Sequence, residues 1–283
     1  MDFSKFKYFL LSLLIHSLQI SHPQLLRPPA LWTLPLYLFS LGTTDWPGLS
    51  SCLLQSVASN GAPTIGLTYG YLRRGDGFRN TRCASLLPDT DAAVECLTEQ
   101  HNDCIYGGTY GSERTYNNAE FWQAVDTRDS IMGRLGLLLY NIDEMNPDSG
   151  WGAYYNLGMG DYPDYLPTPI LSKFTFVGHS QGAGHAAYLA ATQNVFGAAL
   201  ISGPQDECTG CPEGTKFWID EPFTSKKGIT AFAHGDATES DLEPTLPLME
   251  DNWARMATWS APLTVTNVDG YVSYDVCKIP IVS

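Results

Sequence analysis

Positive charge is scarce in this chain. Its 283 residues include 16 Lys and Arg against 30 Asp and Glu, which gives a formal net charge of −14. Proteins that bind phosphate backbones or anionic membrane surfaces normally concentrate Lys and Arg on the contacting face. The composition therefore argues against nucleic acid and against anionic membranes as partners.

Long apolar runs are also few, and the first of them begins the chain. Lys5 and Lys7 form a short basic start, and a mostly apolar run from Tyr8 to Ile20 follows. A basic start followed by about a dozen apolar residues is typical of a secretory signal peptide and is too short for a stable membrane span. We expect residues 1–21 to be a signal peptide, cleaved near Ser21, and the protein to be secreted; an uncleaved anchor or a gene-model artefact is the alternative.

The seven cysteines fit an oxidising compartment, where they become candidates for disulfides. Cys83, Cys96 and Cys104 are close in sequence, and we expect one bridge among them. Cys208 and Cys211 form a C-x-x-C without a second pair at zinc-finger spacing, so a local disulfide or plain thiols are expected rather than a metal site. Neither a metal nor an organic cofactor is implied.

Internal repeats and linkers are absent, whereas apolar residues, at 44%, are ample for one core. Strand patterns alternate with helical patterns, as expected for a parallel sheet built from βα units. The expected class is α/β, a mostly parallel central sheet flanked by helices in one domain over residues 22–283. Strands are expected at 36–41, 64–69, 174–177, 197–201, 228–233 and 263–268, and helices at 50–59, 89–99, 118–145, 181–191 and 247–257. The aromatic segment 150–169 is interpreted either as a loop packed by its own side chains or as a wall facing a substrate.

The most informative stretch is Gly178-His179-Ser180-Gln181-Gly182, which follows an apolar strand and opens a helix rich in Ala and Gly. This is the G-x-S-x-G pattern of a nucleophile elbow, a strained turn that presents the serine hydroxyl clear of the backbone. The helix N-terminus behind it favours negative charge that develops nearby. The alternative is an ordinary strand-to-helix turn that contains a serine.

The strand, the G-H-S-Q-G turn and the helix resemble the α/β-hydrolase superfamily. Three further features resemble a little-characterised secreted branch of it, and the resemblance covers roughly residues 36–270. They are the longer run 178–188, Asp129-Ser130-Ile131 with Arg134-Leu135, and Ser202-Gly203-Pro204.

This resemblance implies a catalytic triad in the order nucleophile, acid, histidine. Ser180 would attack a carbonyl carbon, and the backbone N–H groups of Gln181 and Thr43 would form the oxyanion hole. Asp236 would be the acid because it follows the second strand after the elbow, with Asp206 as the reserve choice. The expected activity is a serine hydrolase that cleaves an ester or related acyl group of a small molecule or lipid, and acyl transfer to another acceptor is the alternative chemistry.

The pattern requires a histidine after the acid, and this sequence lacks one there. The chain has six histidines, and none of them follows Asp236. The side chain of His179 is expected to point away from the Ser180 hydroxyl, and His185 is expected to belong to the core. Among the histidines present, His234 is the candidate for the base. Two explanations stand side by side: the domain is incomplete at its C-terminus, which we favour, or the protein is a non-catalytic binding protein with the same fold.

Overall fold

A single parallel sheet forms the centre of the protein. The computed structural model describes residues 35–40, 51–68, 83–107, 125–158, 166–224, 229–234, 246–259 and 263–268. In the described residues six strands pair in the order β2-β1-β5-β6-β7-β8, and every neighbouring pair is parallel. The strands are β1 (Leu36–Ser40), β2 (Thr64–Leu67), β5 (Phe174–His179), β6 (Gly197–Ile201), β7 (Ile229–His234) and β8 (Leu263–Val268). The predicted α/β class is confirmed, and each predicted strand is present to within two residues.

Strand β5 occupies the middle of the sheet because it is apolar on both faces. Its residues from Phe174 to Gly178 are all buried, as expected for a strand covered by helices on each side. β1 is its neighbour on one side, with Leu36 and Leu38 fully buried, and β6 is its neighbour on the other. The elbow therefore begins on the most protected strand of the molecule.

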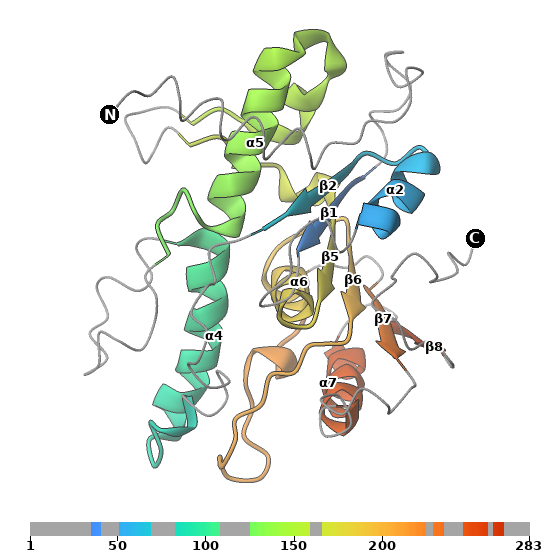
Figure 1. Ribbon diagram of the computed structural model, residues 1–283. Helices are drawn as coiled ribbons and strands as arrows, with labels where there is room; N and C mark the ends of the chain where they lie inside the picture. Colours follow the sequence, from blue (N-terminus) through green and yellow to red (C-terminus); the bar gives the residue numbers. More distant parts are fainter. Residues whose placement is uncertain are drawn as a thin grey trace.

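The connections place helices on both faces of the sheet. The crossover through α2 (Ser51–Ser59) leads from β1 outward to β2, whereas the crossovers through α6 (Gln181–Thr192) and α7 (Leu246–Trp259) lead in the opposite direction. Parallel crossovers are right-handed, so α2 covers one face while α6 and α7 cover the other. In Figure 1, α6 and α7 are both seen almost along their axes, and α2 lies apart from them beside β2.

Two long helices flank this core, and both differ from their predicted bounds. α4 (Thr90–Tyr106) begins at Asp89, whose side chain accepts the N–H of Ala92, and it extends beyond the predicted end at 99. α5 (Ile131–Met145) begins at Ser130, whose hydroxyl accepts the N–H of Gly133 at 3.1 Å.

The predicted start of α5 near residue 118 is wrong. Residues 125–130 form a turn, in which the Asp126 carboxylate accepts the N–H of Arg128 at 2.8 Å. Gly133 then lets the helix start close to that turn, because a Cβ there would lie 1.9 Å from the carbonyl oxygen of Thr127. Residues 118–124 of the predicted helix lie outside the described residues.

The aromatic segment after α5 folds on itself in its described part. It contains η4 (Pro147–Ser149), η5 (Trp151–Tyr154), the short antiparallel pair β3 (Tyr155–Asn156) and β4 (Thr168–Pro169), and η6 (Leu171–Lys173). Tyr154 is buried against Phe174 with ring centroids 6.0 Å apart, and the Tyr155 hydroxyl donates to Asp143 at 3.0 Å. These two side chains therefore pack against strand β5 and helix α5.

Two disulfides are present in the described part of the chain. Cys83 is joined to Cys96, both fully buried, which confirms the expected bridge in that region. Cys208 is joined to Cys211, in the loop between β6 and η7 (Trp218–Asp220). Residues 1–21, the expected signal peptide, lie outside the described residues.

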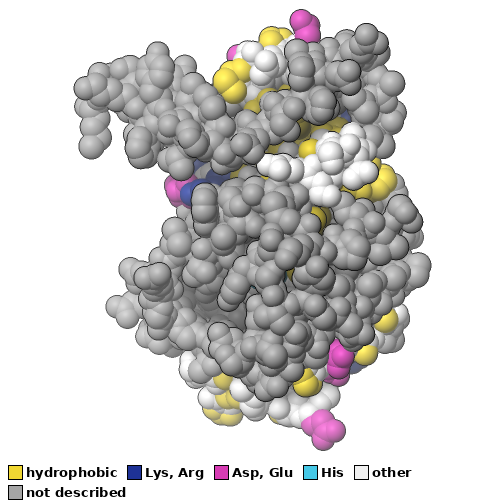
Figure 2. All heavy atoms as spheres, turned by 45° about the vertical axis from the view of Figure 1, so that its right-hand side comes forward, with side chains coloured by type: hydrophobic (Ala, Val, Ile, Leu, Met, Phe, Trp, Pro, Cys, Tyr) yellow, Lys and Arg dark blue, Asp and Glu magenta, His cyan; other side chains and the backbone are white. Residues whose placement is uncertain are grey.

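Among the residues that the structure describes, no helix is long and apolar enough to cross a membrane. On the face drawn in Figure 2, the described Lys and Arg side chains form no extended patch.

Candidate active site

Ser180 lies in the turn between β5 and α6 with a backbone conformation that non-glycine residues rarely adopt. Its φ is 52° and its ψ is −119°, so the residue is strained. The strained backbone is held by its neighbours, since the Ser180 N–H donates to the carbonyl of Ile201 at 2.9 Å and its own carbonyl accepts from Ala183 at 3.0 Å. The hydroxyl makes no capping bond to α6, and the residue is half-buried. The turn has the backbone geometry expected of a nucleophile elbow.

Two glycines allow the chain to close around this turn. A Cβ on Gly178 would lie 2.0 Å from the carbonyl oxygen of Gly182, so only glycine lets the strand and the helix meet there. A Cβ on Gly203, after β6, would lie 2.6 Å from the carbonyl oxygen of Ser180. The tight packing explains why small residues are needed on both sides of the serine and on the neighbouring strand.

Helix α7 fixes the segment that lies against the elbow. The indole N–H of Trp253 donates to the carbonyl of Gly203 at 2.9 Å, and the side-chain amide of Asn252 donates to the carbonyl of Asp206 at 2.9 Å. Both side chains are buried. The conformation of residues 203–206 is therefore set by a helix more than 40 positions later in the chain.

Gln181 is the first residue of α6, with its side chain buried. The first N–H groups of a helix have no acceptor within the helix, and the helix dipole makes this end favourable for negative charge. The role of Gln181 as an oxyanion-hole donor stays a prediction that this place at the start of α6 permits.

The other predicted site residues, Thr43 and Asp236, lie outside the described residues. Their strands do end at the expected edge of the sheet: β1 ends at Ser40, three residues before Thr43, and β7 ends at His234, two residues before Asp236. Because β1, β5, β6 and β7 are parallel, their carboxyl ends share one edge with Ser180. Thr43 and Asp236 remain predictions.

A buried polar network, which the sequence did not predict, joins α4, α6 and the loop after β6. The ring nitrogen Nε2 of His101 lies 2.6 Å from Oδ2 of Asp206, and the indole N–H of Trp218 donates to the same oxygen at 2.8 Å. Nδ1 of His101 lies 2.9 Å from Nδ1 of His185. His101, His185 and Asp206 are each fully buried. Asp206, the reserve choice for the acid, is thus bonded to His101 and Trp218, and its role as the acid stays a prediction.

Aromatic rings enclose this network. Tyr188 stacks on His101 with centroids 4.9 Å apart, and Trp218 meets His101 edge-on at 5.2 Å. The expectation that His185 belongs to the core is confirmed. His179 is exposed on the strand end, and its side chain is on the solvent side of the sheet edge.

No sequence spacing reveals the network, because His101 is separated from His185 by 84 positions and from Asp206 by 105. A weaker signal did exist in α4. The helix carries the run Glu99-Gln100-His101 and Asp103 at positions that prove to be buried, and buried polar side chains require partners.

The parallel sheet, the helices on its two faces and the strained serine at its central strand define a protein of α/β-hydrolase-like architecture. No family model matches the sequence, and no curated protein is significantly similar to it. Among solved structures, the chain is similar to the carboxylesterase of Bacillus cereus, with a TM-score of 0.42 and 14% identity over 83% of this chain and 79% of that one. At that distance the likeness carries no argument about chemistry, which has to come from the site itself.

Proposed function

We propose that the protein is a serine hydrolase that cleaves an ester or related acyl bond of a small molecule or lipid through an acyl-enzyme on Ser180. The observation that carries this proposal is the conformation of Ser180, strained at φ 52° and enclosed by Gly178 and Gly203. Strain of this kind persists only where the surroundings impose it, and it is concentrated at functional sites. A serine that merely linked a strand to a helix would have no need of it.

In the proposed reaction the Ser180 Oγ attacks the carbonyl carbon while a base accepts its proton. The oxyanion of the tetrahedral intermediate accepts hydrogen bonds from the backbone N–H groups of Gln181 and Thr43, and the alcohol then leaves with the proton. Water repeats the sequence on the acyl-enzyme and releases the acid. Asp236 is proposed to orient the base.

The base has to accept the proton of Ser180. His101 and His185 are fully buried, and His101 bonds to His185 and Asp206, so we propose the base elsewhere. His234 is the resident candidate because β7 ends there, at the same sheet edge as Ser180. Its proposed partner, Asp236, follows two residues later.

A second candidate function is binding without catalysis. The specific observation in its favour is that His101 and His185 are fully buried and that His101 bonds to Asp206 and to His185. A protein of this fold without its base would retain the elbow and the oxyanion-hole donors but lose most of its rate acceleration.

Labelling with a fluorophosphonate probe separates the two functions. The native chain and the Ser172→Ala variant, which alters an exposed serine on η6, are expected to be labelled, whereas Ser180→Ala is expected to give none. The native chain and Ser172→Ala should also hydrolyse p-nitrophenyl esters, and the rate should fall at least about a thousandfold in Ser180→Ala. A folded native chain that labels no more than Ser180→Ala would contradict the catalytic function and favour binding.

A further inference from the structure

The Cys208–Cys211 disulfide lies at the surface, in contrast to the other disulfide of the described chain. Cys83 and Cys96 are fully buried in the core, whereas Cys208 and Cys211 are each partly exposed and the two residues between them, Thr209 and Gly210, are exposed. Access decides which disulfide a dissolved thiol can attack. The two bridges should therefore differ in reactivity within one molecule.

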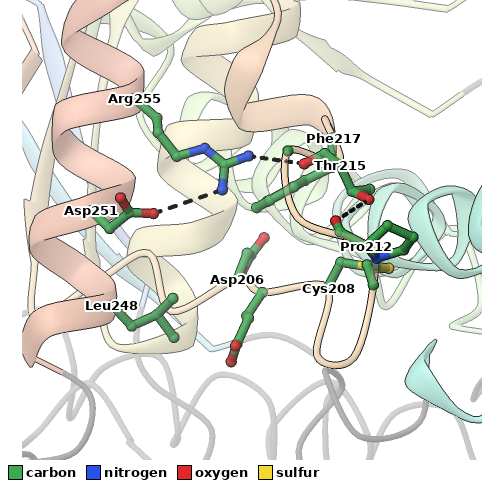
Figure 3. Close-up of a pocket in the computed structure, with 11 residues that line it drawn as sticks. Asp206, Cys208, Pro212, Thr215, Phe217, Leu248, Asp251 and Arg255 are labelled. Atoms are coloured by element: carbon green, nitrogen blue, oxygen red, sulfur yellow. Dashed lines mark hydrogen bonds and ion pairs between the residues drawn. A yellow bond between two sulfur atoms is a disulfide. The ribbon is translucent and has the colours of Figure 1, made fainter.

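Both cysteines also line a solvent-open pocket of about 220 Å³, between the loop after β6 and helix α7. Figure 3 shows Cys208 beside Pro212 on one side of this pocket and Arg255 extending from α7 on the other. A small thiol can enter from solvent and approach the sulfur atoms there. Cys208 packs against the hydrophobic core, so we assign the attack by an incoming thiol to Cys211.

The charges around this pocket are mostly negative. The exposed carboxylates Glu207 and Asp251 line it, and its single lining cation, Arg255, is already engaged. The Arg255 guanidinium donates to both carboxylate oxygens of Asp220, one of them at 2.8 Å, and lies 3.9 Å from Asp251. In the loop itself, Glu207 and Glu213 outnumber Lys216. An approaching anion is therefore repelled, and a neutral or cationic thiol is not.

We propose that Cys208–Cys211 is a thiol–disulfide exchange site that accepts small neutral or cationic thiols in preference to anionic ones. The incoming thiolate attacks Sγ of Cys211, the S–S bond breaks, and Cys208 leaves as a thiolate that takes a proton from water. The protein then carries a mixed disulfide at Cys211. A second thiol molecule attacks this mixed disulfide, which releases the small disulfide and leaves the protein with two thiols.

The experiment treats the folded native chain with graded dithiothreitol, alkylates it with iodoacetamide and quantifies each cysteine by peptide mass spectrometry. Cys208 and Cys211 should be alkylated at concentrations that leave Cys83 and Cys96 bridged, with circular dichroism unchanged. Bridges that are reduced only together, upon unfolding, would overturn the proposal. Alkylation of Cys208 and Cys211 without any reductant would overturn it as well.

The charge preference is tested with cysteamine and mercaptoethanesulfonate at low salt. Each rate is normalised to that thiol's rate with an uncharged small disulfide, which removes intrinsic reactivity. Cysteamine should form the Cys211 adduct several-fold faster, and the ratio should fall towards one in high salt or in Glu207→Gln. An unchanged ratio in both conditions, or a faster reaction of the anionic thiol, would overturn the preference.

Discussion

At the scale of single residues, the turn around Ser180 depends on Gly178, where the strand and the helix approach each other closely. A Cβ on Gly178 would lie 2.0 Å from the carbonyl oxygen of Gly182, and that backbone is held inside α6. Gly178→Ala is therefore expected to destabilise the fold by about 3 kcal/mol or more, because the strand and helix must separate. Equilibrium unfolding in urea measures the change.

Gly214→Ala is the matched control for this prediction. Gly214 has a φ of 80° and open space around its missing Cβ, so alanine there adds backbone strain of about 1 kcal/mol without a clash. Equal losses for the two variants would show that the close approach at Gly178 does not matter.

Asp103, on α4, makes the stability depend on pH. Burial raises the pKa of Asp103 from its usual 3.8 to about 6, although the N–H of Val125, which donates to its carboxylate at 3.2 Å, opposes the shift, and nearby Glu99 adds to it. The unfolded chain loses this proton near pH 3.8 and the folded chain near pH 6, so folding becomes less favourable as the pH rises through that window. Above it, the buried charge costs up to roughly 3 kcal/mol.

Asp103→Asn removes this cost while its amide oxygen still accepts the Val125 N–H. The variant is expected to be more stable than the native chain by about 1–3 kcal/mol at pH 7.5 and to lose this advantage below pH 4. Asp148→Asn, which alters an exposed carboxylate, controls for the change in net charge. Urea unfolding at both pH values measures the added stability of Asp103→Asn. An equal gain at pH 7.5 and below pH 4 would contradict the prediction.

At the scale of elements, the buried network ties α4 to the helix of the nucleophile. Asp206 accepts from His101 and Trp218, so Asp206→Ala leaves two buried donors without their acceptor and is expected to cost about 2–5 kcal/mol. A double-mutant cycle of Asp206→Ala with His101→Ala should give a coupling above about 1 kcal/mol. Additive losses in thermal or urea unfolding would show that the contact contributes nothing specific.

The elements differ in how far the sequence predicted them. Strands such as β5 and β6 are apolar runs that end at glycine or serine, and that local signal is sufficient. The start of α5 was not predictable from periodicity, because the apolar spacing continues into residues 121–125 while the bonds of Asp126 and Ser130 determine where the helix begins. The contact of His101 with Asp206 depends on the packing of α4 against α6, which no local pattern contains.

The residues of the candidate site also divide into those with a local sequence signal and those placed by tertiary packing. Ser180 and Gln181 were predictable because the turn, the strand and the helix are contiguous in sequence. The support from Trp253 and Asn252 was not, because α7 reaches residues 203–206 only after β7 and its loop have been added to the sheet. A strained residue is thus encoded locally and held in place from a distance.

At the scale of the whole molecule, the proposed destination is the secretory pathway. The proposal combines the basic and apolar segment at residues 1–21 with two disulfides, which form and persist mainly in oxidising compartments. The full chain, expressed in a eukaryotic cell, should appear in the medium without residues 1–21 and with both bridges formed. Intact mass and disulfide mapping of the secreted protein measure both results.

Leu13→Arg with Leu14→Arg provides the control, because two charges interrupt the apolar run that a signal peptide requires. This double variant should stay inside the cell with its N-terminus intact. There neither the Cys83–Cys96 nor the Cys208–Cys211 bridge is expected to form, because the cytosol keeps thiols reduced. Secretion of the double variant at the native level, or native protein that keeps Met1 inside the cell, would contradict the secretory destination without touching the proposed chemistry of Ser180.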